Sequence, residues 1–177
     1  MREVGYENLF DMATTAAGYI NKIYLHWTAG LYDQKFDDYH LNITGDGRLW
    51  ISCSKLTEYK EHTWHRNSSA IGIALCCCFD ATAYADGTVN FGSIPPTAAQ
   101  IDAMSKAVAV LCQGLNLSIS PYSVMTHAEA ADADGYGPAT TCERWDLWKL
   151  PDIPGPGGIN QGGDVIRGKA IWWQSKS

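Results

Sequence analysis

The segment Ile71–Phe79, IGIALCCCF, contains almost no polar residue. A continuous apolar run of this length is typical of a strand that is covered on both faces of a sheet. We therefore predict that it is a central strand. Its three consecutive cysteines, Cys76–Cys78, alternate between the two faces of such a strand, so they cannot all meet one partner.

The six cysteines do not form a recognisable framework. The chain contains no pair of CxxC motifs, which argues against a structural zinc site. The start of the chain also lacks a secretory signal, so buried, reduced thiols are a better interpretation than disulfides.

The segments on either side of the central run predict further strands and one long helix. Asp38–Ile43 and Arg48–Ile51 flank a Gly-Asp-Gly turn, which indicates a hairpin. Thr97 and Gln100 form a capping-box pattern, and apolar residues then recur at intervals of three and four, which predicts a core helix. This apolar stripe consists of Ile101, Met104, Val108, Leu111 and Leu115.

The remaining segments are less regular. Tyr19–Trp27 and Tyr122–Thr126 predict two more strands. His26 lies at the end of the first, and His127 directly follows the second. Residues 1–18 predict a helix ending at Gly18, Asp80–Pro96 a loop, and Pro151–Gly163 a second loop. Asp164–Trp173 fits either a last short helix or a strand.

These elements predict one α/β domain over residues 1–177, with a central mixed sheet of about five strands flanked by helices. We find no composition break or linker that would divide a chain of this length.

Charge and hydropathy exclude some classes of function. The formal net charge is −6, and no cluster of Lys and Arg is present, so we expect no nucleic-acid binding. The first twenty residues carry Arg2, Glu3, Glu7 and Asp11 and lack an apolar core. We therefore expect neither a signal peptide nor a membrane span.

The segment Met125–Leu150, MTHAEAADADGYGPATTCERWDLWKL, holds the candidate chemistry. A predicted strand ends at His127, and a Gly- and Ala-rich loop leads from there to Asp146. His26 lies at the end of another predicted strand. Two His and one carboxylate with an open fourth position are a recurring set of catalytic zinc ligands.

These segments together resemble the zinc-dependent N-acetylmuramoyl-L-alanine amidases, a family that includes amidase-type phage lysozymes and the peptidoglycan recognition proteins. The resemblance spans residues 23–151, with 1–22 as an N-terminal extension and 152–177 as a C-terminal loop and tail. The segments that carry it, in the family's order, are IYLHWTAG from Ile23, DYHLNITGDGRLW from Asp38, HTWHRNSSAIGIAL from His62, VMTHAE from Val124 and RWDLWKLP from Arg144.

The resemblance implies that His26, His127 and Asp146 bind Zn²⁺ and that water takes the fourth position. Zinc lowers the pKa of bound water to about 7 and polarises a carbonyl. A second candidate for the third ligand is Cys142, because Thr140-Thr141-Cys142 fits a family variant in which Thr precedes a ligand Cys by two residues. Thiolate is the stronger zinc donor, but the apolar surroundings of Asp146 favour the carboxylate.

The resemblance also implies two catalytic residues. Arg144, two positions before Asp146, would stabilise an oxyanion; the family more often has Lys or Thr there, and guanidinium cannot shuttle protons. Tyr39 occupies the position of the family's tyrosine, while Ala74 stands where a subgroup has Glu. Because the tyrosine pKa lies near 10, we expect Tyr39 to orient water by a hydrogen bond. The alternatives are a surface ion pair for Arg144 and a half-buried hairpin residue for Tyr39.

We expect His62 to contact the substrate or steady the oxyanion, with Trp64 and Asn67 of the same segment also binding substrate. A solvated loop histidine is the alternative for His62. Glu129 is a candidate acceptor for a ligand imidazole. His40 and His65 are expected to be structural.

The activity implied by the resemblance is hydrolysis of the amide between N-acetylmuramic acid and L-alanine in bacterial peptidoglycan. The alternatives are a non-catalytic peptidoglycan-binding module of the same fold and a zinc peptidase that cuts within the stem peptide. We expect a monomer that is made in the cytoplasm and acts on the cell wall after release or delivery.

Overall fold

The computed structural model describes residues 1–153, 155 and 161–176 of the 177-residue chain. Its elements in chain order are β1 (Arg2–Glu3), α1 (Tyr6–Ala16), β2 (Lys22–Trp27), β3 (Leu41–Ile43), β4 (Leu49–Ile51), β5 (Ala70–Leu75), β6 (Thr82–Ala83), β7 (Val89–Asn90), α2 (Ala98–Leu115), β8 (Val124–Thr126), α3 (His127–Ala133) and α4 (Gly162–Gln174).

A mixed sheet forms the centre of the domain, in the order β1-β4-β3-β5-β2-β8. Strands β3, β5, β2 and β8 are parallel, whereas β4 runs antiparallel to both β3 and β1. The predicted mixed α/β fold is confirmed. The sheet has six strands rather than about five among the described residues, because Arg2 and Glu3 add an edge strand along β4.

The residues of β2 alternate between the two faces of the sheet. Ile23, Leu25 and Trp27 belong to the large hydrophobic core. Tyr24 lies in a second, small cluster with Ala130 of α3, so alternate residues of β2 point to the opposite face. His26 has the same parity as Tyr24 and is fully buried. The strand therefore presents His26 on the α3 side of the sheet.

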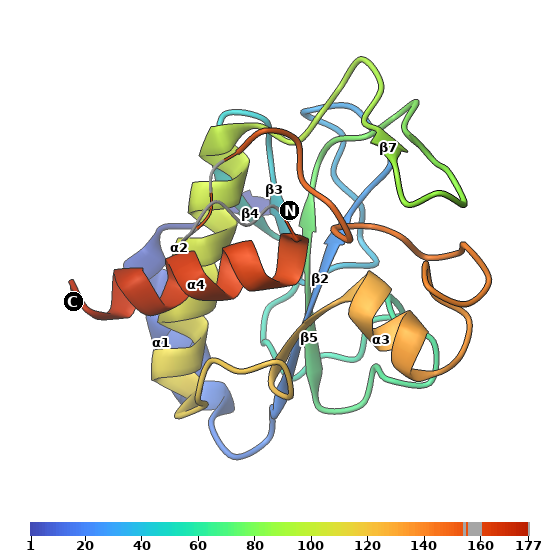
Figure 1. The fold of residues 1–177 in the computed structure, drawn as a ribbon. Helices are drawn as coiled ribbons and strands as arrows, with labels where there is room; N and C mark the ends of the chain where they lie inside the picture. Colours follow the sequence, from blue (N-terminus) through green and yellow to red (C-terminus); the bar gives the residue numbers. More distant parts are fainter. Residues whose placement is uncertain (154, 156–160, 177) are drawn as a thin grey trace.

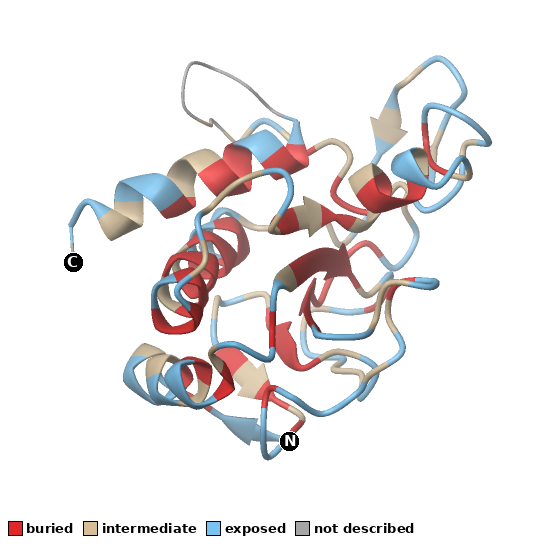
Figure 2. Ribbon diagram, turned by 90° about the horizontal axis from the view of Figure 1, so that it is seen from below, coloured by how far each residue is buried: buried red, intermediate tan, exposed pale blue. Residues whose placement is uncertain are grey.

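Helices α1, α2 and α4 lie together against one face of the sheet, and α3 lies on the other side (Figure 1). The view from below shows buried residues concentrated between the strands and these three helices (Figure 2). The predicted capping box of α2 is present. The side chain of Thr97 accepts a hydrogen bond from the backbone N–H of Gln100, and the side chain of Gln100 accepts one from the backbone N–H of Thr97. All five residues of the predicted stripe are buried.

Several predicted boundaries need correction. The chain after His127 is a helix, α3, rather than a Gly- and Ala-rich loop throughout, because Thr126 and Glu129 form a capping box that starts it. The central strand ends at Leu75 instead of Phe79, and the 80–96 loop contains the small β6–β7 hairpin. The last element is a helix. Of the predicted loop 151–163, residues 154 and 156–160 lie outside the described residues.

The segments that precede and follow the resemblance pack into the same core. α1 and α4 both contact α2, and Leu9, Val165 and Ile166 are fully buried. Within the described residues, the helices are all too short or too polar to span a bilayer. All six cysteines are free; five are buried and Cys142 is partly buried.

Candidate metal centre

Three side chains from distant parts of the chain converge beside the end of β2. The Nδ1 atoms of His26 and His127 are 3.2 Å apart. Oδ2 of Asp146 lies 3.2 Å from Nδ1 of His26, and Oδ1 of Asp146 lies 3.2 Å from Nδ1 of His127. One ligand atom from each residue can be chosen so that all three lie within 4.8 Å of one another. This is the arrangement expected of three ligands that share one metal ion.

The donor set fits zinc. Bonds of about 2.0–2.1 Å at tetrahedral angles place neighbouring ligand atoms about 3.3–3.4 Å apart. The two Nδ1 atoms are 3.2 Å apart, and each of them is 3.2 Å from one carboxylate oxygen of Asp146, which is close to this spacing. Two imidazole nitrogens and a carboxylate leave one tetrahedral position open, which is typical of catalytic rather than structural zinc sites. Cys142 does not belong to such a group among the described residues.

The second ring nitrogen of His26 has its own partners. Nε2 lies 3.3 Å from Oγ1 of Thr63 and 3.2 Å from Nδ1 of His62. If Nε2 carries the proton, it donates to one of these atoms. Nδ1 then has a free lone pair on the side of His127 and Asp146. Thr63, which was not singled out from the sequence, offers an oxygen that can accept this proton.

The electrostatics of the cluster favour the metal-binding protonation states. Burial lowers the pKa of His26, against the opposing effect of its hydrogen bond with Asp146. Burial alone would raise the pKa of Asp146, but His127 and His26 more than offset this and hold that pKa below its usual range. A neutral His26 and an ionised Asp146 are the forms that coordinate a divalent cation.

His127 is held at the junction of β8 and α3. It is the first residue of α3, directly after the N-cap residue Thr126. Glu129 accepts a hydrogen bond from the Thr126 backbone N–H at 2.8 Å and forms an ion pair with Arg167 at 2.7 Å. The interpretation of Glu129 as an acceptor for a ligand imidazole is therefore not supported, because both of its oxygens are used elsewhere.

Asp146 lies in a tight turn whose backbone is constrained. Leu147 adopts a left-handed conformation with φ 62° and is fully buried, and Trp148 N–H donates to Trp145 O at 3.0 Å. Trp145 packs edge-on against Trp27 at the end of β2. The apolar neighbours thus anchor the carboxylate, as the sequence indicated.

Arg144 is exposed and also has a positive φ of 47°. Neither a hydrogen bond nor an ion pair links it to Glu143 or Asp146 within the described part of the chain. The predicted alternative of a surface ion pair with either residue is not present.

A row of small residues on β5 makes room for His62. Tyr24 pairs with Gly72 and His26 with Ala74 across the parallel ladder. A Cβ atom on Gly72 would lie 2.6–2.9 Å from three atoms of the His62 ring, so this ring rests directly on the strand backbone. Burial and the neighbouring histidines lower the pKa of His62 to about 2, which keeps it neutral. His62 is therefore a partly buried neighbour of His26 and not a solvated loop residue.

Tyr39 lies beside the cluster. Its ring centroid is 5.1 Å from that of His26 and 6.5 Å from that of His62. Burial, followed by the charge of Asp146, raises the pKa of Tyr39 well above its usual value. The phenol stays protonated and can donate a hydrogen bond, but it cannot serve as a base by itself.

A hollow of about 430 Å³ opens beside His62. Its lining consists of Tyr59, Glu61, His62, Thr63, Trp64, His65 and Asn67. Trp64 is 62% exposed and packs on Tyr136, which leaves most of its ring available to a ligand. The side-chain oxygen of Asn67 is used internally, because it accepts from the backbone N–H groups of His62 and Thr63.

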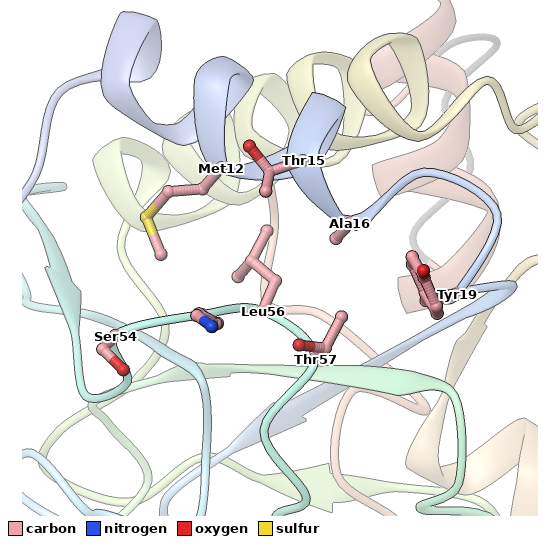
Figure 3. A pocket seen from close by; sticks show the side chains of 8 residues that line it. Met12, Thr15, Ala16, Tyr19, Ser54, Leu56 and Thr57 are labelled. Carbon is pink, nitrogen blue, oxygen red and sulfur yellow. The ribbon is translucent and has the colours of Figure 1, made fainter.

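Arg66, which lies between His65 and Asn67 of this hollow, links the segment to α3. It makes two hydrogen bonds of 2.7 Å to Asp134, the C-cap of α3, and a weaker one of 3.4 Å to the hydroxyl of Tyr24. A different hollow, of about 320 Å³, lies between α1 and residues 54–57 (Figure 3) and shares no residue with the candidate metal centre.

The model of a family described as N-acetylmuramoyl-L-alanine amidase matches residues 16–150. The chain belongs to this family. The matched segment contains His26, His127 and Asp146, as well as Tyr39, His62 and Arg144. It ends before α4.

Solved structures that match part of this chain include two endolysins and a PGRP. The endolysin amidase LysCS from Clostridium intestinale URNW is 18% identical, covers 63% of this chain and 71% of its own, and has a TM-score of 0.47. The Ph2119 endolysin from a Thermus scotoductus bacteriophage is 19% identical, with coverages of 64% and 75% and a TM-score of 0.48. PGRP-SA from Apis mellifera is 18% identical, with coverages of 62% and 72% and a TM-score of 0.45. A search of curated proteins returned no match.

Proposed function

We propose that the protein is a zinc-dependent hydrolase of the amide bond between N-acetylmuramic acid and L-alanine in peptidoglycan. The observation that carries the proposal is the convergence of His26, His127 and Asp146, with donor atoms 3.2 Å apart, in a chain that belongs to an amidase family. Bound zinc would polarise the scissile carbonyl and lower the pKa of water to about 7.

The surrounding residues divide the remaining work. Tyr39, kept protonated by burial, donates a hydrogen bond that orients the attacking water. His62, neutral and held against Gly72, lies beside the substrate hollow that Trp64 and Asn67 also line. Arg144 is exposed and free to approach the oxyanion of the tetrahedral intermediate.

The acid–base assignment follows from this geometry. Asp146 is used in the ligand set, and position 74 is Ala, so the buried strand beside His26 offers no carboxylate base. Because Tyr39 stays protonated and His62 has a low pKa, neither replaces that carboxylate, and we propose that the proton released by the water reaches the leaving amine through solvent. We propose that Tyr39, whose ring centroid is 5.1 Å from that of His26, donates a hydrogen bond to this water, while the ring of His62, at 5.2 Å, lies on the side of the hollow.

The net charge of −6 gives no general attraction to anionic wall polymers, so we propose that binding depends on local contacts in the hollow. We further propose that the enzyme is monomeric, is made in the cytoplasm and acts on the wall after release or delivery.

Mass analysis of digested muropeptides tests the proposal most directly. Purified peptidoglycan should release stem peptides with new L-alanine amino ends, and the glycan strands should remain uncut. New reducing sugars without free alanine amines would refute the amide assignment. Cleavage inside the stem peptide would indicate a peptidase, and binding without any product would indicate a recognition module.

A further inference from the structure

The first two turns of α4 touch both segments that carry the second and third candidate ligands. α4 lies beyond the residues that the family model matches. We infer that α4 supports the candidate metal centre and that Arg167 is a positioning residue for His127. This inference rests on the proposed role of His127 as a ligand.

Arg167 bonds to the chain on both sides of His127. Its Nη1 donates to the carbonyl oxygen of Val124 and to Oε2 of Glu129, both at 2.9 Å. Its Nη2 donates to Oε1 of Glu129 at 2.7 Å and to Oδ1 of Asp164 at 2.8 Å. The Arg167 side chain is only 7% exposed, so the guanidinium is held in one place. A planar fork of this kind fixes direction as well as distance.

Glu129 transmits this constraint to the ligand. Its carboxylate accepts from the Thr126 backbone N–H at 2.8 Å, and its own N–H donates to Oγ1 of Thr126 at 3.1 Å. These two bonds enclose His127, which follows Thr126 directly. Arg167 therefore sets the place of a carboxylate that in turn fixes the backbone from which the His127 ring projects.

Two glycines allow α4 to come this close. A Cβ atom on Gly163 would lie 2.5–2.7 Å from the carboxylate of Glu129. A Cβ atom on Gly162 would overlap the carbonyl oxygen of Leu147, the residue after Asp146. Lys149 and Gln161 form an isolated antiparallel bridge beside this contact. The start of α4 thus lies against the Asp146 turn and the His127 cap at once.

Removal of a buried arginine also lowers stability, because it leaves Glu129 without its partner. The experiment must therefore separate positioning from folding. We would compare Arg167→Met and Arg167→Lys with two controls. Lys169→Met breaks the pair with Asp102 on α2, and Asp164→Asn removes the charge of the more exposed partner of Arg167 but keeps an acceptor oxygen.

The first readout is zinc affinity, measured by competition with a chromogenic chelator at a temperature where circular dichroism shows each variant folded. We expect Arg167→Met to weaken zinc binding about tenfold, the lower end of the effect of losing groups that orient a ligand. Arg167→Lys should show a smaller loss, since one ammonium can still reach Glu129. Lys169→Met and Asp164→Asn should bind zinc like the parent.

The second readout is hydrogen exchange in the metal-free protein. We expect the Thr126 amide to exchange at least about tenfold faster in Arg167→Met, whereas the Leu111 amide in α2 keeps its parent rate once the change in global stability is removed. Unchanged zinc affinity together with unchanged local exchange at Thr126 would overturn the inference.

The zinc-dependent function and the positioning role of Arg167 can be refuted independently. If the parent protein binds no zinc, the proposed function loses its metal, and the exchange rate of Thr126 alone decides whether Arg167 positions His127. If Arg167→Met does not fold, Arg167→Lys and Glu129→Gln supply the same comparison.

Discussion

At the residue scale, the third ligand is the assignment most open to a direct test. Asp146 has a carboxylate oxygen 3.2 Å from Nδ1 of His26 and another 3.2 Å from Nδ1 of His127, whereas Cys142 is outside this cluster. We expect Asp146→Ala to lose zinc and activity because only two ligands remain, and Cys142→Ser to keep both. Elemental analysis of the purified variants measures the metal. Zinc kept by the first variant and lost by the second would reverse the assignment.

Tyr39 supplies a second test at this scale. Tyr39→Phe should lower the rate roughly 10²-fold, in line with the loss of a positioned proton-transfer group, while zinc content stays unchanged. The ring itself remains to pack beside His26, so the fold should not change. Steady-state rates on purified muropeptides measure the effect. An unchanged rate would move the orienting role to another group, with His62 the next candidate.

His40 predicts a pH dependence of stability. This residue is fully buried; Nδ1 accepts from the Gly72 backbone N–H, and Nε2 donates to the Glu58 carbonyl oxygen. Burial, aided by Lys60 and opposed by Glu58, lowers the pKa of His40 from 6.5 to about 4, and the ring of His62 lies 5.8 Å away.

Between pH 6.5 and about 4 the unfolded chain binds more protons at His40 than the folded one, so stability falls as the pH falls through this window. The full effect, reached below pH 4, is about 3 kcal/mol. Urea unfolding of the parent and of His40→Gln across this range would show it as a shallower pH dependence in the variant. Parallel curves for the two proteins would contradict it.

At the scale of elements, β5 matters because its α3-facing row is made of small residues. Gly72→Ala would push a methyl group into the His62 ring. We expect a loss of stability of about 1–3 kcal/mol from overpacking, and a loss of activity as His62 leaves the side of His26.

A double-mutant cycle provides the control. In a His62→Ala background the same glycine substitution should cost much less, because the clashing ring is gone. Equal costs in both backgrounds would show that His62 does not rest on Gly72. Chemical denaturation measures all four proteins.

At the scale of the whole molecule, the three residues of the candidate metal centre project from elements that are packed by the hydrophobic core and do not need a metal to hold them. His26 projects from a central strand, His127 from a capped helix and Asp146 from a turn with fully buried Leu147. We expect chelation to abolish the loss of turbidity of wall suspensions while leaving the far-ultraviolet circular dichroism unchanged.

The melting temperature should also fall on chelation, since a ligand at 100 to 1,000 times its Kd contributes roughly 3–4 kcal/mol. Added zinc should restore both activity and melting temperature. Full activity in excess chelator, with no metal detected in the protein, would contradict the zinc-dependent mechanism.

The sequence by itself determined the elements whose signals are local. The capping box and apolar stripe of α2 and the apolar run of β5 each lie within one short window, because cap hydrogen bonds and helical periodicity join residues a few positions apart. The turn between β3 and β4 is local in the same way. The positions of His26, His127 and Asp146 could also be predicted, because each residue follows or interrupts an apolar run.

Only the tertiary structure decided which of these residues meet. His26 and His127 are 101 positions apart, and their contact depends on the parallel pairing of β2 with β8, whose register no local pattern encodes. The same holds for Thr63 beside His26, for Gly72 under His62 and for Arg167 against Glu129. The His26–Thr63 and Glu129–Arg167 contacts join residues 37 and 38 positions apart, and the shorter-range contact of His62 with Gly72 depends on how the loop before β5 folds back on the strand. Their energy appears only when the core has brought the backbones together.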